Sequence, residues 1–443
     1  MSKKVTETLV RNILNTRVEL PKTLINHSKK SLLNWLGVAI GASHHPSIDM
    51  VLEVIKDVGS RPEVSIFGRS ERVDILWGSL INGMSSHVFD FDDTHLDSIH
   101  HPSGPVAPVV FALGEKYCFS GDKLLHAFII GREVELRISN AIYPHHYDLG
   151  WHITSTAGVF GAAAAAGLLL NLTEEQMIYA LGIAGTQSSG LREMFGTMTK
   201  SFHPGKAAQN GLLAALLAKK GFTSSKHVLE AKRGFANVLS PEHDLRKVNL
   251  AWGENWELLK NTFKPYACGI VLHPAIDACI ELRKYATPVD VQEVQIEVNP
   301  YVLELTGKQE PKNGLEGKFS IYHSAAIAFI EGDASQEQYS DERVLETAEF
   351  RKKIKIFSDP TLREDQAVAK LILLNGEKIE FKVEHATGCL SNPMTSEALV
   401  KKFMKLVSPI IGTSNIKQLT NQILTIEKLP NLAEVITYCK SNI

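Results

Sequence analysis

Titratable side chains are concentrated in one short stretch, HVFDFDDTHLDSIHHPSGP, which spans residues 87–105. Between Asp90 and His101 it holds four aspartates, three histidines and one threonine. A metal centre, an acid/base centre with a carboxylate-oriented histidine, and a solvated loop that caps a helix could each use such residues. The spacing matches no helix-borne zinc motif such as H-E-x-x-H, which disfavours a metal. The supply of carboxylates makes an acid/base centre feasible.

Three further stretches carry side chains that could bind an anion or move a proton. GWHITSTAGVFG places His152 among hydroxyls just before an apolar helix, near the positive end of the helix dipole. MTKSFHPGKAAQNG holds Lys200 and His203 upstream of another helix, an arrangement suited to a carboxylate or phosphate clamp. FKPYACGIVLHPAIDA holds Lys264 where two domains are predicted to join. The alternative interpretations are a helix cap, solvated lysines and a packed linker.

Composition disfavours several classes of protein. The 443 residues carry a net charge of -2, with 47 Lys and Arg against 49 Asp and Glu, which gives no reason to expect a nucleic-acid or membrane partner. The five cysteines include no C-x-x-C pair and their number is odd, so neither a disulfide framework nor a thiolate metal site is expected. The first residues, MSKKVTETLVRNIL, lack the apolar core of a signal peptide. These features predict a cytoplasmic protein.

The elements that must position these residues are mostly helices. Apolar periodicity predicts helices over most of residues 1–266, including a capping box at Thr173 and a buried apolar helix over residues 157–170. After residue 266 the pattern changes. VQEVQIEV and KKIKIF alternate as strands do, and AKLILLNGEKIEFKVEH predicts a hairpin around Asn375 and Gly376. Helical patterning returns with MTSEALVKKFMKLVSP.

These patterns predict the fold class and the domains. We expect a mainly α protein with a large all-helical domain, residues 1–266 completed by residues 394–443. A smaller α+β lid domain, residues 267–393, is expected to be inserted into it.

Six motifs in register resemble the MmgE/PrpD family. They are FDFDDTH…HHPSGPVAPV, GWHITSTAGVFGAA, TKSFHPGKAAQNGLLAALLA, KPYACGIVLHPAIDA, GKFSIYHSAA and NPMTSEALVKKF, and the resemblance spans about residues 10 to 410. The family contains cis-aconitate decarboxylases, 2-methylcitrate dehydratases and iminodisuccinate epimerases. The resemblance implies a mostly helical domain with an α+β lid and a homodimer. It also implies catalysis without a cofactor or a metal ion.

The resemblance to the decarboxylase branch also implies roles for individual residues. The residues expected to be catalytic are Asp90, Thr94, His101, His152, Lys200 and Tyr322. Lys264 is expected to bind substrate, and so is His203, which belongs to the clamp motif. This chain departs from the branch by one extra residue between Thr94 and His101, so His100 is a rival to His101.

The expected activity is that of a cofactor-free lyase acting on a small di- or tricarboxylate. Decarboxylation of cis-aconitate to itaconate is the first choice, because every active-site position of that branch finds its residue type here. The alternatives are a dehydratase of 2-methylcitrate or a related hydroxy-tricarboxylate, and an iminodisuccinate-type epimerase. Two different classes also remain: a non-catalytic carboxylate-binding relative and a metal-dependent hydrolase.

Overall fold

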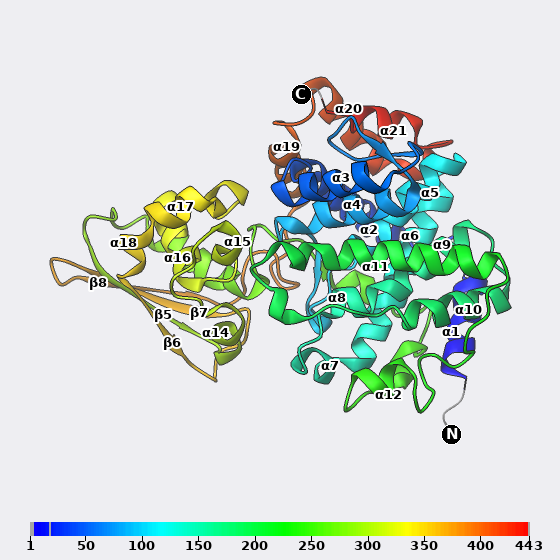
Figure 1. Cartoon of the computed structure of the whole chain (residues 1–443). Coiled ribbons are helices and arrows are strands. Elements are labelled where there is room, and N and C mark those ends of the chain that lie inside the picture. Colours follow the sequence, from blue (N-terminus) through cyan, green and yellow to red (C-terminus); the bar gives the residue numbers. More distant parts are fainter. Residues whose placement is uncertain (1–3, 17–18, 442–443) are drawn as a thin grey trace.

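The computed structural model describes residues 4–16 and 19–441, and it is mainly helical (Figure 1). Most helices gather in a larger lobe, on the right in Figure 1. Its helices are α1 (Val5–Asn15), α2 (Lys22–Gly41), α3 (Pro46–Val58), α4 (Ile75–Val88), α5 (Ser103–Tyr117), α6 (Gly121–Ile142), α7 (His145–Asp148), α8 (Ile153–Thr156), α9 (Gly158–Leu169), α10 (Glu174–Gly185), α11 (Met198–Lys219), α12 (Phe235–Leu239), α19 (Ser396–Val407), α20 (Thr413–Leu424) and α21 (Ala433–Tyr438). Two small antiparallel pairs accompany them: β1 (Val64–Ser65) with β2 (Arg72–Val73), and β3 (Thr94–His95) with β4 (Asn261–Thr262).

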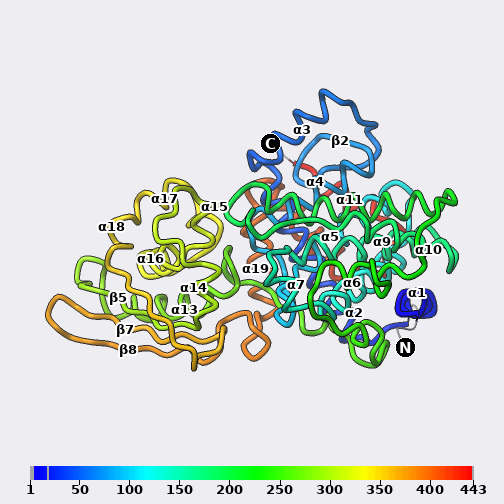
Figure 2. Tube along the Cα trace, turned by 60° about the horizontal axis from the view of Figure 1, so that its bottom comes forward, coloured from blue at the N-terminus to red at the C-terminus, as the bar shows by residue number. Residues whose placement is uncertain are grey.

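A smaller lobe lies beside the larger one (Figure 2). The chain enters it before α13 and returns to the larger lobe at α19. Its elements are α13 (His273–Leu282), β5 (Val291–Val298), α14 (Pro300–Thr306), α15 (Gly314–Gly317), α16 (Ile321–Glu331), α17 (Asp341–Glu346), α18 (Ala348–Arg351), β6 (Ile354–Ser358), β7 (Ala367–Leu373) and β8 (Lys378–Val383).

The smaller lobe is built on a four-stranded sheet with the strand order β6-β5-β7-β8. β5 runs parallel to β6 and antiparallel to β7, and β7 and β8 form the predicted hairpin. Gly376 in its turn has a φ of 88°, a value that glycine adopts without strain. Alternate residues of β7 are buried, and α13 contacts both β7 and β8. The helices therefore cover one face of the sheet (Figure 1).

Small residues let the helices of the larger lobe approach closely. The predicted apolar helix is α9, in which every residue except Leu168 is buried. α4 and α11 cross at Gly83 and Gly205, where a Cβ on Gly83 would lie 2.7 Å from the Cα of Gly205. This crossing brings the end of α4, which Asp90 follows by two residues, beside the beginning of α11, which carries Lys200 and His203.

One further local prediction, the capping box, is also confirmed. Thr173 and Gln176 form the predicted capping box of α10. α19 packs on α2, where a Cβ on Gly37 would lie 2.8 Å from Cδ2 of Phe403, so the C-terminal segment completes the larger lobe. None of the five cysteines forms a disulfide. Among the described residues, no helix has both the length and the apolar character needed to cross a membrane.

Candidate active site

A narrow cavity of about 40 Å³ lies where the two lobes meet. From the larger lobe it is lined by five of the predicted residues: Asp90, His101, His152, Lys200 and Lys264. The smaller lobe adds Leu305 and Thr306 at the end of α14 and Phe319 just before α16. A larger hollow of about 410 Å³ adjoins this cavity, and both are lined by Ile99, Ile270 and Val271.

Local backbone geometry gathers these side chains from distant parts of the chain. α4 ends at Val88, and Asp90 then adopts a φ of 50°, which aspartate tolerates better than most residues. The pairing of β3 with β4 places Lys264 beside Asp90. A bridge between His95 and His100 closes the following loop and places His101 directly before α5.

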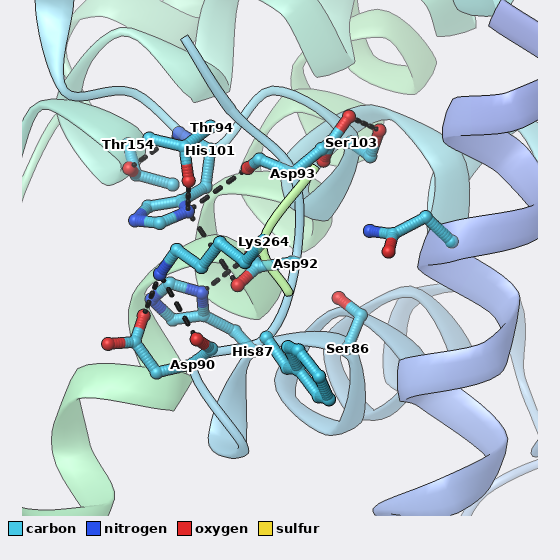
Figure 3. Close-up of polar contacts among 12 residues, drawn as sticks. Ser86, His87, Asp90, Asp92, Asp93, Thr94, His101, Ser103, Thr154 and Lys264 are labelled. Carbon is cyan, nitrogen blue, oxygen red and sulfur yellow. Dashed lines mark hydrogen bonds and ion pairs between the residues drawn. The ribbon is translucent and has the colours of Figure 1, made fainter. Parts of the chain in front are cut away.

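Asp90 is held by two buried lysines, Lys200 and Lys264, of which Figure 3 shows Lys264. Its Oδ1 accepts hydrogen bonds from Nζ of Lys200 at 3.0 Å and from Nζ of Lys264 at 2.9 Å. Burial would raise the pKa of Asp90, but these two ammonium groups outweigh it and hold the pKa well below its ordinary value. Asp90 is therefore a carboxylate at neutral pH.

The two lysines differ in how many of their protons are already used. Lys264 Nζ donates to Oδ1 of Asp90, to the Asp90 carbonyl at 3.1 Å and to the Cys268 carbonyl at 3.0 Å. An ammonium has three N–H donors, so Lys264 is fully occupied. Among the described residues, Nζ of Lys200 hydrogen-bonds only to Asp90 Oδ1 and to Nε2 of His87, at 3.0 and 3.1 Å, and it also lies over the rings of Phe195 and Phe319. Lys200 thus retains one donor for a ligand in the cavity.

His101 presents one ring nitrogen to the cavity. Its Nδ1 lies 3.1 Å from the Asp93 carbonyl, 3.1 Å from Oγ1 of Thr94 and 3.6 Å from Oδ1 of Asp92 (Figure 3). A carbonyl can only accept, so Nδ1 carries the proton and Nε2 has the free lone pair. Nε2 has no hydrogen-bond partner within the described part of the chain. Burial lowers the pKa of His101 well below its ordinary value.

His152 stands at the N-terminal end of α8 and is supported from behind by His203. The two Nδ1 atoms lie 2.8 Å apart, so one ring donates to the other. Burial, with the charge of nearby Lys200, lowers the pKa of His203 to about 4, and the pKa of His152 also falls well below its ordinary value through burial. His203 does not line the cavity. It contacts the site through His152.

Thr94 and Tyr322 were also predicted to be in the site, and His100 was the rival to His101. Thr94 touches His101 but does not line the cavity. His100 points elsewhere, with Nδ1 2.8 Å from Ser139 Oγ and Nε2 3.4 Å from a carboxylate of α6. Tyr322 lies on α16, where its hydroxyl accepts a hydrogen bond from Gln309 at 3.2 Å outside the cavity. The structure therefore brings His101, but neither His100 nor Tyr322, to the cavity.

Several residues near the cavity were not predicted from the sequence. His87 and Asp92 belong to the stretch HVFDFDDTHLDSIHHPSGP, and Lys318 is the second residue of the motif GKFSIYHSAA. Lys318 lines a small hollow with Asp90 and Lys200, and burial lowers its pKa to about 7. Lys402 donates to the Lys264 carbonyl at 3.0 Å and to the Phe91 carbonyl at 2.6 Å. His87 and Lys318 are titratable residues inside stretches that were already recognised in the sequence, and no role had been assigned to them. That combination is the signal that could have found them.

Four residues could in principle hold a metal ion, because ligand atoms of His87, Asp90, Asp92 and His101 lie within 4.8 Å of one another. Two ammonium groups already neutralise Asp90, and both ring nitrogens of His87 are engaged, by Lys200 and by Asp92. A cation at this place would have to displace Lys200 and Lys264. The arrangement is better suited to an anion.

Comparison with known proteins identifies matching families and relatives. The MmgE/PrpD N-terminal domain matches residues 7–247, and the MmgE/PrpD C-terminal domain matches residues 266–427. A cis-aconitate decarboxylase of Mus musculus is 28% identical over 98% of this chain and 92% of its own length. Cis-aconitate decarboxylases of Homo sapiens and Aspergillus terreus are 25% and 24% identical, over 99% and 94% of this chain and 95% and 92% of their own lengths.

Proposed function

The chain belongs to the MmgE/PrpD family, and from this premise we propose that it is a cofactor-free carboxy-lyase that converts cis-aconitate to itaconate. The names of its relatives favour this activity over the other two of the family. One structural observation carries the proposal: buried lysines outnumber aspartates beside two cavity histidines whose pKa values are lowered.

The charge balance points to an anionic substrate. Four buried lysines, Lys200, Lys264, Lys318 and Lys402, surround two buried aspartates, Asp90 and Asp92. The neighbouring Asp93 already pairs with Arg132 at 3.2 Å. Burial lowers the pKa values of Lys200, Lys318 and Lys402, and a bound anion would favour the charged forms of these lysines. A di- or tricarboxylate would do so, and the free donor of Lys200 is placed to bind one of its carboxylates.

The proposed reaction requires one proton for each CO₂ released. The bond between the CH₂ carbon and its carboxylate breaks, and the electron pair moves into the neighbouring double bond. A proton then adds to the far carbon of that allylic system. The trianion plus one proton gives the itaconate dianion and CO₂. The site must therefore stabilise an allylic carbanion and hold a proton donor at one carbon.

His101 and His152 are proposed as the proton donors, and Lys200 as the group that stabilises negative charge. A bound tricarboxylate would raise the lowered pKa values of both histidines, because nearby anions favour the imidazolium form. Asp90 keeps Lys200 and Lys264 in place, and Thr94 supports His101. Positioned acid/base groups contribute roughly 10²–10⁴-fold to a rate.

Two alternatives remain within the family. Two histidines lining one cavity would also suit an epimerase, in which opposite bases exchange one α-proton. A dehydratase of 2-methylcitrate or a related hydroxy-tricarboxylate would use the same cations to bind carboxylates. Neither alternative predicts release of CO₂.

One experiment separates these activities. The purified protein is incubated in deuterated water with cis-aconitate, 2-methylcitrate and iminodisuccinate in parallel, and products are followed by NMR. The proposal predicts itaconate with one deuterium in the CH₂ group beside a carboxylate. Hydration or dehydration products, or α-deuterium exchange without CO₂ release, would contradict it. Metal analysis and chelator treatment of the same sample test the proposal that no metal is needed.

We also propose how the whole molecule works. The smaller lobe, residues 267–393, acts as a lid on the helical domain, and two chains form a homodimer. A cavity of about 40 Å³ has room for only a few waters, since each needs at least ~10–15 Å³. The lobes must therefore separate to admit a tricarboxylate before they close over it. Size-exclusion chromatography with light-scattering detection measures the mass of the assembly and tests the homodimer.

A further inference from the structure

We propose that His87 and Asp92 are positioning residues that connect Lys200 to His101 through a buried chain of hydrogen bonds and an ion pair. The chain would fix which nitrogen of His101 carries a proton and stabilise that ring when it becomes charged. This inference rests on the proposed function of the same site, but it concerns two residues that the family resemblance did not single out.

The chain is continuous and buried. Lys200 Nζ lies 3.1 Å from Nε2 of His87, and Nδ1 of His87 lies 2.7 Å from Oδ2 of Asp92. Oδ1 of Asp92 lies 3.6 Å from Nδ1 of His101 (Figure 3). The side chains of His87 and Asp92 are both 0% exposed. The His87 ring also contacts the rings of His101 and His152, with centroids 4.8 and 5.8 Å away.

Proton positions along the chain follow from what each group can donate. A lysine ammonium can only donate, so Nε2 of His87 must accept. His87 is neutral because burial lowers its pKa well below the ordinary value, so its single proton is on Nδ1. That proton is donated to Oδ2 of Asp92, and we assign the carboxylate form to Asp92 although burial raises its pKa.

The second oxygen of Asp92 then acts on His101. The Asp93 carbonyl accepts the proton on Nδ1 of His101, and the negative charge of Asp92 Oδ1, 3.6 Å away, favours the proton at this nitrogen and leaves Nε2 facing the cavity. When Nε2 gains the proton that the reaction needs, the ring becomes an imidazolium beside the Asp92 carboxylate. A carboxylate in this place stabilises the charged ring and keeps its orientation, as in hydrolase triads.

The chain also divides the work of the two aspartates. Asp90 contacts lysines, whereas Asp92 contacts histidines. Loss of Asp92 should therefore affect the proton-transfer step, and loss of Asp90 should affect the lysines that bind substrate. This difference separates positioning from a structural role, because a merely structural aspartate would not act on kcat alone.

The test uses the full-length protein and the variants Asp92→Asn and His87→Gln. With cis-aconitate, Asp92→Asn should lower kcat by roughly 10²–10⁴-fold, the range for a triad aspartate or one acid/base group, while KM stays within about threefold. His87→Gln should lower kcat less. The control is His146→Gln. His146 is a buried histidine whose two nitrogens contact Leu239 and Thr156 outside the cavity, and its loss should leave kcat unchanged.

A second readout does not depend on the substrate. NMR of protein labelled with ¹⁵N-histidine reports which ring nitrogen carries the proton. The wild type should show His101 and His87 protonated on Nδ1, and Asp92→Asn should give His101 a mixture of both neutral forms. An unchanged His101 signal in Asp92→Asn, or a normal kcat, overturns the inference. If the wild type does not act on cis-aconitate, the proposed function fails, and the NMR result alone decides on the chain.

Discussion

At the scale of single residues, the two lysines on Asp90 differ: one has a donor free for a ligand, and the other uses all of its donors within the protein. Lys264 uses all three of its donors on Asp90 and Cys268, whereas Lys200 keeps one for a ligand. The sequence motifs treated both lysines alike, because a motif does not show how many hydrogen bonds each side chain already makes. The two lysines should therefore respond differently to the same substitution.

Lys200→Met is expected to raise KM strongly and to lower kcat, because a cation on a substrate carboxylate contributes more as negative charge develops. Lys264→Met is expected to lower the free energy of unfolding by roughly 3–5 kcal/mol, since it leaves Asp90 and two carbonyls without a partner. Lys206→Met is the control, because Lys206 does not line the cavity and its hydrogen-bond partner in the described chain is Gln209. Steady-state kinetics and urea denaturation measure both effects. Equal, small changes for Lys200 and Lys206 would contradict the binding role.

His101→Ala is expected to abolish turnover while the protein stays folded, because it removes the ring nitrogen that faces the cavity. His100→Ala is the matched neighbour and should retain most of the kcat, since His100 points at Ser139. Loss of the His100 side chain should mainly lower the free energy of unfolding, because this side chain is fully buried. Kinetics with thermal denaturation of both variants provides the measurement. An inactive His100→Ala beside a nearly normal His101→Ala would reverse the assignment.

At the scale of elements, local patterns predicted most of the fold and distant pairings could not be predicted. β5 lies where its alternation placed it, and the hairpin turns at Gly376 as expected. The pairing of β3 with β4 joins residues 94–95 to residues 261–262, and it is this pairing that brings Lys264 to Asp90. β6 lies parallel to β5 across more than fifty residues. Such contacts depend on tertiary packing, which no local period encodes.

The site residues show the same limit. Five residues that line one cavity could be predicted as a set, because the family resemblance supplied them together. His87 and Asp92 were passed over because, in the sequence, a histidine near a helix end and one aspartate among four look like an ordinary cap. Their burial and mutual contact exist only in the folded chain.

The crossing of α4 and α11 positions Lys200 relative to Asp90, and its glycines make it sensitive. Gly83→Ala is expected to destabilise the fold by about 1–3 kcal/mol and to lower kcat/KM, because the new Cβ would meet backbone atoms of Gly205. Gly41→Ala is the control. Its Cβ would be equally tight, 2.9 Å from the Leu406 carbonyl, but far from the cavity. Both variants should lose stability, and only Gly83→Ala should lose activity in the folded protein.

At the scale of the whole molecule, many histidines are buried in the neutral form. Burial lowers the pKa of several of them to about 3 or 4: His27, His146, His203, His273 and His323. In the unfolded chain each would have a pKa near ~6.5. Between these values the unfolded state binds more protons, so acid favours unfolding.

The free energy of unfolding is therefore expected to fall as the pH drops from about 6.5 towards 4, by up to ~1.4 kcal/mol per pH unit for each histidine. Acids whose pKa values burial raises act in the opposite direction: Asp92, Asp93, Glu133, Glu135, Asp277 and Glu364. They are fewer than the histidines whose pKa values burial lowers, which also include His45, His87, His100, His101 and His152. Urea denaturation at pH 7.5 and pH 5.5 measures the change. A midpoint that stays constant or rises on acidification would show that the histidines do not dominate.

Closure of the two lobes would bring Tyr322 towards the cavity. Phe319 already lines the cavity, and Tyr322 follows it by three residues at the start of α16, so a movement of the smaller lobe could bring its hydroxyl to a bound substrate. Closure would exclude water from a carbanion-like intermediate and bring the Tyr322 hydroxyl to the substrate. Tyr322→Phe should then lower kcat, because this contact is lost, and leave fold and dimer intact, because only one hydroxyl is removed. Tyr285→Phe, at an exposed position of the same lobe, is the control. Small-angle scattering should show compaction when a tricarboxylate saturates the wild type. A wild-type kcat for Tyr322→Phe, together with an unchanged scattering profile, would remove Tyr322 from the site and leave the lobes as a fixed frame.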